Sequence, residues 1–163
     1  MGSEMCIRDS LSAERAFTVL ENRRIMIPDL SRSRLEELIE LRVSLETHAA
    51  VRAIPYLSDK KIETLIQLDE QANEAVRKKD HARVVVTNQE FHSCLYESNP
   101  EQIIMPMIES VWLQIGPVLK EAARTADRLE HDYHIDIIDS LKARDVTAVA
   151  DAIANDIRTS ITL

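Results

Sequence analysis

The sequence predicts an all-α protein, an antiparallel bundle of six to seven helices preceded by a short β-hairpin. The chain has only 2 glycines and 5 prolines in 163 residues, so few positions favour turns over helices. Hydrophobic residues make up 45% of the chain and recur at helical spacing from about residue 31 to the end. Short connections separate these stretches, which favours antiparallel neighbours.

Residues 1–10 are expected to be a non-native leader, because no apolar period joins them to the rest. Met1-Gly2-Ser3 resembles an expression tag, and residues 4–10 resemble translated sequencing-adapter sequence. We therefore exclude this segment from the fold. On this interpretation the natural protein extends further toward its N-terminus, and the chain is a fragment.

Residues 11–28 contain two short β-prone runs, 16–20 and 25–27, on either side of a polar turn. This arrangement indicates a β-hairpin, which by itself is only marginally stable in water. A helix over residues 12–20 followed by a loop is the alternative interpretation. Pro28 ends the segment in either case.

Six helices are expected in residues 31–163, and no linker interrupts this range, so it should form one domain. A serine or aspartate precedes most of the periodic stretches, and Ser33 has Glu36 three residues later, the pattern of a capping box. Pro106 and Pro117 should kink or split the fourth helix. The expected ranges are about 33–53, 58–79, 80–98, 100–125, 127–143 and 145–163, with N-caps at Ser33 or Ser31, Ser58, Asp80 and Asp145.

The charge distribution argues against direct binding of the helical part to nucleic acid. The formal charge is −8, and the excess lies beyond Pro28, where 16 basic side chains face 24 acidic ones. Such a surface repels a phosphate backbone, so any DNA contact requires a part that the chain lacks. Two cysteines are too few for a disulfide framework, which favours the cytoplasm, and no apolar run approaches the roughly 20 residues that span a bilayer.

Asn88 and His92 are polar residues on a face that should be buried. They lie four residues apart, about one helical turn, and share a stripe with apolar residues at the i, i+3, i+4 and i+7 positions. A buried polar group without a partner costs about 1–3 kcal/mol, so a metal, a ligand, a water or another side chain must meet these atoms.

His134 and Asp156 are the candidate partners on later helices. His134 shares a face with Ile138 and Leu141, and Asp156 lies at the border of the last apolar stripe. Two imidazoles, a carboxylate and an amide oxygen would suit a divalent transition metal, with zinc first and nickel or manganese as alternatives. From spacing alone, a hydrogen-bonded core histidine is the commoner explanation of such a residue.

Arg42 occupies the middle of the first helix's buried stripe, three residues after Ile39 and three before Leu45. A guanidinium is hardly ever buried without a partner. Glu46, one turn later, is the structural candidate. Alternatively, Arg42 faces a cavity and grips the carboxylate of a small ligand with its planar fork.

Three stretches of the chain together resemble a known family. Residues 40–46 (ELRVSLE), 88–96 (NQEFHSCLY) and 134–145 (HIDIIDSLKARD) are similar, in this order, to the FCD effector-binding domain of GntR-type transcription regulators of the FadR-like branch. The resemblance covers about residue 35 to the end. Residues 16–28 resemble the wing of that family's winged helix-turn-helix, so the DNA-recognition helix would be missing.

The resemblance implies a bundle around a cavity that holds a metal and an organic or sugar acid. In the family an acidic residue precedes the Phe-His histidine by one turn, and the last two helices each supply a histidine. His92 and His134 match this pattern, whereas Asn88 and Asp156 depart from it. An anionic ligand is lost at residue 88, and one is gained at residue 156. Arg42 would then hold the acid. A homodimer, with DNA bound only through the missing head, follows from the same likeness.

Two other classes of protein compete with a sensor. A metal-dependent enzyme could use Glu90 or Glu130 as a general base, but Glu90 should face solvent, and the sequence shows no nucleophile–base pair or glycine-rich phosphate loop. A metal-free helical module that only dimerises is the other alternative. We therefore expect no enzymatic activity.

Overall fold

The computed structural model describes residues 18–19, 25–26, 30–125 and 132–160. Within these ranges the chain is almost entirely helical, as the sequence predicts. The expected leader at residues 1–10 lies outside the described part. The elements are β1 (Thr18–Val19), β2 (Ile25–Met26), α2 (Arg32–Ala53), the 3-10 turn η1 (Ile54–Tyr56), α3 (Asp59–Arg77), α4 (His81–Tyr96), α5 (Met105–Thr125), α6 (Tyr133–Ala143) and α7 (Val146–Thr159).

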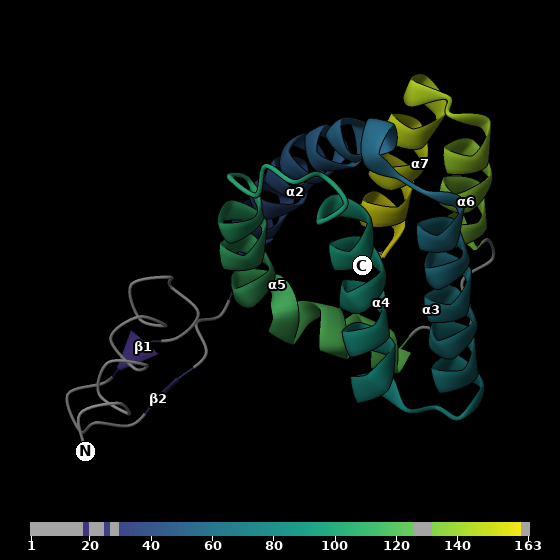
Figure 1. Ribbon diagram of the computed structural model, residues 1–163. Coiled ribbons are helices and arrows are strands. Elements are labelled where there is room, and N and C mark those ends of the chain that lie inside the picture. Colours follow the sequence, from purple (N-terminus) through teal and green to yellow (C-terminus); the bar gives the residue numbers. More distant parts are fainter. Residues whose placement is uncertain (1–17, 20–24, 27–29, 126–131, 161–163) are drawn as a thin grey trace, which may run out of the picture.

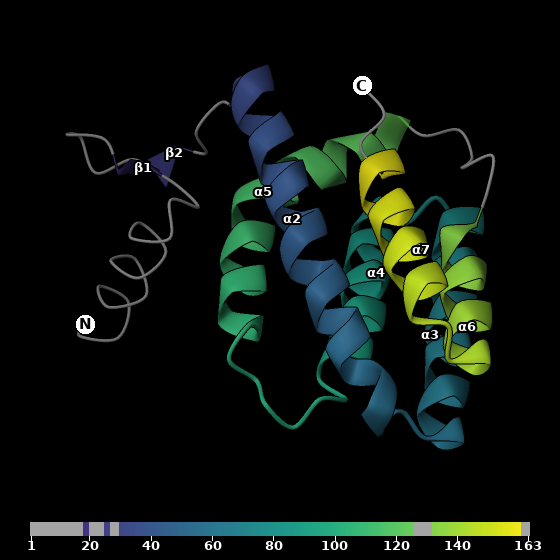
Figure 2. The same cartoon turned by 90° about the horizontal axis from the view of Figure 1, so that it is seen from above.

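The six described helices form two layers of three (Figures 1 and 2). In one layer α7 packs between α2 and α6, and in the other α4 packs between α3 and α5. The layers are joined where α2 crosses α5 and α4 and where α3 meets α6. The two middle helices, α4 and α7, therefore face each other inside the bundle.

Most helices begin where the sequence predicts. Ser58, Asp80 and Asp145 each accept a hydrogen bond from a backbone N–H in the first turn of the helix that follows. For the first helix the sequence offered Ser33 or Ser31, and the N-cap is Ser31. The Ser31 side chain accepts from the N–H of Arg34, so Ser33 lies inside the first turn and the capping box does not form there.

The fourth and fifth expected helices begin later than predicted. Helix α5 starts at Met105 rather than near residue 100, so Pro106 falls in the first turn, where a missing N–H costs little. Pro117 lies inside α5, and the helix bends in Figure 1, as a proline that removes a backbone bond requires. Helix α6 starts at Tyr133 with Asp132 as its N-cap, and residues 127–131 lie outside the described part.

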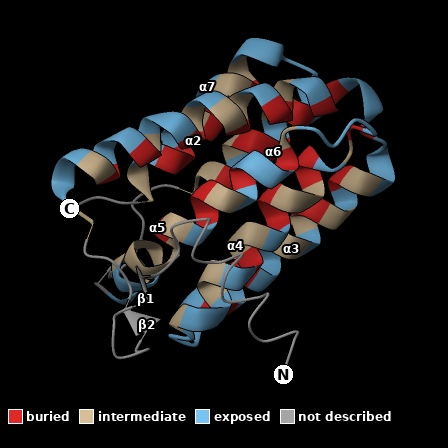
Figure 3. Cartoon of the chain, turned by 90° about the vertical axis from the view of Figure 1, so that its left-hand side faces the viewer, coloured by how far each residue is buried: buried red, intermediate tan, exposed pale blue. Residues whose placement is uncertain are grey.

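The hydrophobic core lies between the two layers, where the buried faces of the helices meet (Figure 3). Its largest cluster joins residues of α2, α3, α4, α5, α6 and α7, with Phe91, Leu95 and Ile153 fully buried. A smaller cluster packs Leu35 and Leu38 of α2 on Val111 and Ile115 of α5. This apolar surround makes the polar residues between α4 and α7 stand out.

The two strands pair antiparallel, with Thr18 opposite Met26 and Val19 opposite Ile25. This pairing agrees with the expected hairpin at the two runs that the sequence marks as β-prone. Among the described residues, no helix is long and apolar enough to cross a membrane.

Arg144 ties the turn before α7 to the connection between α2 and α3. Its backbone adopts a left-handed conformation, with φ of 56°, which ends α6. Its guanidinium donates to the carbonyl oxygens of Ile54 at 2.7 Å and of Leu57 at 2.6 Å. One side chain thereby satisfies the carbonyl of the first residue of η1 and that of the residue directly after it, nearly ninety positions earlier in the chain.

Replacing Arg144 should destabilise the bundle. Arg144→Gly removes both donors, and glycine adopts the left-handed backbone conformation without strain. The free energy of unfolding should therefore fall by about 1–2 kcal/mol. Urea denaturation measures this change. Lys142→Ala, which removes an exposed pair with Asp139, is the control and should change the value by less than about 0.5 kcal/mol. Equal effects of the two substitutions would contradict the role of the Arg144 contacts.

Candidate metal and ligand site

His92 of α4 is held on one side and bare on the other. Its ring is 1% exposed, and its Nδ1 lies 3.0 Å from the Tyr96 hydroxyl, one turn along the helix. Its Nε2 lies 3.1 Å from Oδ2 of Asp156 on α7. That distance suits an ion pair, but the two atoms form no hydrogen bond, and Nε2 has no other hydrogen-bond partner. A buried nitrogen without a partner is available to a ligand.

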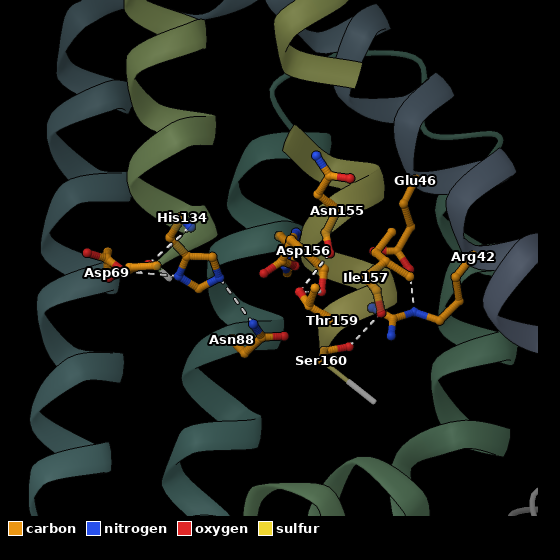
Figure 4. A network of polar contacts seen from close by, with 12 residues as sticks. Arg42, Glu46, Asp69, Asn88, His134, Asn155, Asp156, Ile157, Thr159 and Ser160 are labelled. Atoms are coloured by element: carbon orange, nitrogen blue, oxygen red, sulfur yellow. Dashed lines mark hydrogen bonds and ion pairs between the residues drawn. The ribbon is translucent and has the colours of Figure 1, made fainter. Parts of the chain in front are cut away.

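His134 of α6 is held from both sides. Its Nδ1 lies 3.0 Å from Oδ1 of Asp69 on α3, and its Nε2 lies 3.1 Å from the side-chain Nδ2 of Asn88 (Figure 4). An ionised carboxylate only accepts, so Nδ1 carries the proton and Nε2 accepts from the amide. The ring also stacks on Phe91, with centroids 4.0 Å apart and planes 10° apart. His134 therefore points Nε2 toward α4 and α7.

The cluster gathers ligand atoms from three helices. One such atom from each of His92, His134 and Asp156 lies within 4.8 Å of the other two, and all three residues are buried. Asn88 is half-buried beside them. A half-turn of its amide would replace nitrogen by oxygen in front of His134. The four residues that the sequence singles out thus lie together.

The buried charges around the cluster do not balance. Among the described residues, the buried arginine, aspartate and glutamate side chains are Arg42, Glu46, Asp69 and Asp156. Arg42 neutralises Glu46, which leaves two carboxylates against two imidazoles. With neutral imidazoles the region carries two uncompensated negative charges. Either two protons or one divalent cation would balance them, and burial makes an uncompensated charge costly.

The directions of two pKa shifts agree with an anionic site. Burial disfavours a charged His134 ring, but the hydrogen bond to Asp69 and the charges of Asp156 and Asp132 outweigh it and raise the pKa of His134 above 6.5. Burial also opposes the ionisation of Asp156, yet contact with His92 and the charges of His92, His134 and Arg42 lower its pKa below 3.8. Asp156 is therefore a carboxylate.

Arg42 has the structural partner that the sequence offers, and a spare donor as well. The guanidinium is 3% exposed, and its Nε donates to Oε1 of Glu46 at 2.7 Å. Its Nη1 is buried and has no hydrogen-bond partner. Figure 4 shows the Arg42–Glu46 pair on one side of Asp156 and the His134 pair on the other. Internal pairing explains most polar contacts of this interior, but not Nη1 of Arg42 or Nε2 of His92.

Asp69, Tyr96 and Trp112 also serve the site, and sequence reasoning did not assign them to it. Asp69 lies four residues after Leu65 and three before Ala72, so the spacing places a carboxylate on a face that should be buried. The same kind of pattern identified Arg42 as a candidate, and it could have identified Asp69. Tyr96 follows His92 by one turn. Trp112 gives no such signal, because its contact with Glu46 joins residues 66 positions apart.

Two other features lie outside the cluster. Glu90 is exposed and pairs with Arg83 at 3.3 Å, so it faces solvent as expected and away from His92. A surface pocket of about 360 Å³ lies between the end of α2 and the connection from α4 to α5. None of the cluster residues lines this pocket; its lining is His48, Arg52, Asn99, Glu101, Ile103, Ile104 and Met107.

Comparison with known proteins identifies what the chain is similar to. The model of the FCD domain matches residues 37–159. The HTH-type transcriptional regulator McbR of Escherichia coli (strain K12) is 29% identical over 140 residues, which cover 83% of this chain and 63% of that protein. The chain thus spans less than two thirds of that relative's length.

Solved structures share the fold. E. coli McbR/YncC superposes with a TM-score of 0.80 at 22% identity, covering 93% of this chain and 78% of that one. A putative GntR transcriptional regulator from Rhodococcus sp. RHA1 gives a TM-score of 0.74 at 19% identity, covering 93% and 73%. At these identities the likeness concerns the fold.

The raised pKa of His134 predicts a pH-dependent stability of the metal-free protein. Its protonated ring adds stability that is fully present below the unfolded pKa of about 6.5 and is lost as the pH rises through the higher folded value. Asp69→Asn removes the carboxylate that holds this proton, so the loss of stability between pH 6 and pH 8 should shrink. Urea denaturation in the presence of a chelator measures it.

The control for this substitution is Asp139→Asn, which changes an exposed carboxylate on the same helix as His134. Its pH dependence should match that of the unmodified chain. An unchanged slope in Asp69→Asn would show that Asp69 does not stabilise the charged ring.

Proposed function

The chain belongs to the FCD domain family, and we propose that it is the sensor domain of a bacterial GntR-type transcription regulator, in which a small carboxylate binds at a divalent metal. One observation carries the proposal. His92, His134 and Asp156 bring ligand atoms from α4, α6 and α7 within 4.8 Å of one another, and Nε2 of His92 lacks any hydrogen-bond partner there.

The donor set favours a transition metal. Two imidazole nitrogens and one carboxylate oxygen suit zinc, with nickel or manganese as alternatives, and the Asn88 amide oxygen can add a weaker fourth ligand. A divalent ion would also balance the two negative charges that neutral histidines leave in this interior. When bound, such an ion polarises an acid oxygen and neutralises its charge; the chain itself orients the histidines and excludes water.

Arg42 is the residue that we propose for the acid. Its unpaired Nη1 is a buried donor, and the charge of Arg42 is among the causes that lower the pKa of Asp156. A ligand carboxylate between them would give Nη1 its missing acceptor and could reach the metal. Because Arg42 is only 3% exposed, entry of the acid requires a helix around it to move, and we propose that this helix is α2.

This requirement suggests how binding becomes a signal. A change in packing between α2 and the rest of the bundle would alter the spacing of two DNA-binding heads in a homodimer, and operator half-sites need a fixed separation. Residues 11–28 are then the remnant of the wing, and residues 31–163 are the effector domain of a cytoplasmic regulator. DNA would be bound only by a head that precedes the chain.

Zinc should bind and stabilise the protein. Added to chelator-treated protein, it should raise the midpoint of thermal unfolding, since binding to the folded state alone adds stability. Asp156→Asn removes the anionic ligand and should weaken the binding of zinc by about tenfold or more. Isothermal titration measures the affinity. Asp151→Asn, an exposed position on the same helix, should leave it unchanged.

Asn88→Asp tests whether residue 88 is the fourth ligand by a substitution that should strengthen the binding of zinc. A carboxylate at this position donates more strongly than an amide, so zinc should bind more tightly than in the unmodified chain. Unchanged affinity would remove residue 88 from the coordination sphere. A protein that no divalent ion stabilises would overturn the proposed function.

A small acid should further stabilise the zinc-loaded protein through Arg42. A panel of lactate, succinate, citrate and gluconate, read by the shift in thermal midpoint, identifies the class. Arg42→Lys keeps the charge but loses the planar fork, so the best acid should bind about tenfold or more weakly. Arg32→Lys, exposed on the same helix, is the control. Equal acid affinity in Arg42→Lys would exclude Arg42 from the acid site.

A further inference from the structure

Glu46 of α2 is the most buried ionisable group near the candidate site. It has no exposed surface and accepts three hydrogen bonds from three helices. Arg42 Nε at 2.7 Å and Trp112 Nε1 at 2.9 Å both donate to Oε1, and the Tyr96 hydroxyl donates to Oε2 at 3.0 Å. A carboxylate that faces a guanidinium and two further donors can only accept.

The Tyr96 hydroxyl lies between Glu46 and His92 and has a single proton. Burial, followed by the charge of Glu46, raises the pKa of Tyr96 well above its ordinary value, so the hydroxyl keeps that proton. Because Oε2 of Glu46 has no proton to give, the hydroxyl proton must point toward it. The hydroxyl oxygen is then left to accept a hydrogen bond from Nδ1 of His92, 3.0 Å away.

This order of donors assigns the proton on His92 without reference to any metal. Nδ1 must carry a hydrogen to donate to Tyr96, so the neutral ring keeps Nε2 as a bare lone pair. On the other side of the ring Nε2 makes no hydrogen bond, although Oδ2 of Asp156 is 3.1 Å away, so in the Nδ1–H form two lone pairs face each other where a cation could bind. We propose that Glu46, acting through Tyr96, is a positioning residue that holds His92 in the Nδ1–H form and so makes Nε2 a metal ligand.

The inference deepens the proposed function and rests on it for its role, but the tautomer can be tested alone. Glu46→Gln keeps the shape of the side chain. Its oxygen would stay with Arg42 and Trp112, both of which only donate, so its NH₂ would face Tyr96. The hydroxyl proton would then turn to Nδ1 of His92, and the ring would switch to the Nε2–H form, donating to Asp156.

The experiment uses the full chain, labelled with ¹⁵N at histidine, in chelator at pH 8. Two-bond ¹⁵N–¹H correlation spectra report which ring nitrogen bears the proton, with His92 assigned by its absence from the spectrum of His92→Gln. We expect Nδ1–H in the unmodified chain and Nε2–H in Glu46→Gln. Glu40→Gln, an exposed glutamate on the same helix, should leave the His92 signals unchanged.

Tyr96→Phe is the second variant, for the case in which Glu46→Gln does not fold. It keeps the buried ring and removes only the hydroxyl, so Nδ1 loses its acceptor and His92 should shift toward Nε2–H, where Asp156 can accept. Tyr56→Phe, at a half-exposed tyrosine, is its control. Both test variants should also bind zinc at least about tenfold more weakly than the unmodified chain.

The outcomes separate the two proposals. Nε2–H in the unmodified chain, or an unchanged Nδ1–H form in a folded Glu46→Gln, would overturn the role of Glu46. Weaker zinc binding in Glu46→Gln without a change of the His92 tautomer would also overturn the role of Glu46, because Glu46 would then act only through packing. An unmodified chain with Nδ1–H that binds no divalent ion would support the role of Glu46 in the tautomer and overturn the metal site instead.

Discussion

A buried carboxylate that must be satisfied by three donors organises the interior of this bundle. Glu46 receives hydrogen bonds from Arg42 on its own helix, Tyr96 on α4 and Trp112 on α5. Leaving such a charge without partners inside a protein costs several kcal/mol, so the three helices can pack only where all the donors reach it. This constraint sets the position of α4 against α2, and with it the direction in which His92 faces.

The second histidine depends on a different carboxylate. Asp69 of α3 orients His134, and Asn73 of the same helix donates to Asp69 at 3.2 Å and to Asp132, the N-cap of α6, at 3.1 Å. A metal-ligating histidine usually donates its other N–H to such a group, which fixes the tautomer and the ring plane. The two imidazoles are thus held by different carboxylates, Asp69 for His134 and Glu46, through Tyr96, for His92.

Glu46 connects the proposed acid site at Arg42 with the proposed metal site at His92. Glu46 contacts Arg42, the residue proposed for the acid, and through Tyr96 also His92, the residue proposed for the metal. A ligand that drew Arg42 away from Glu46 would therefore change the partners of a group on which the metal ligand depends. Packed interiors of this kind respond by shifts between discrete arrangements rather than by continuous deformation. Helix α2, which contacts α4, α5 and α7, is placed to transmit such a shift.

The sequence by itself determined the helices, most of their caps and the polar residues on buried faces, because these depend on spacing within one element. Arg42, Asn88, His92 and His134 each interrupt an apolar stripe, and a stripe can be read from a single helix. The start of α5 was misplaced and the N-cap of α2 was left open between Ser31 and Ser33, because neighbouring prolines and serines fit more than one starting point. Only the tertiary structure decided that Asp69 and Trp112 serve the same interior, and which nitrogen of each histidine faces the cluster. Those features depend on contacts between residues 65 and 66 positions apart, and no local period encodes such contacts.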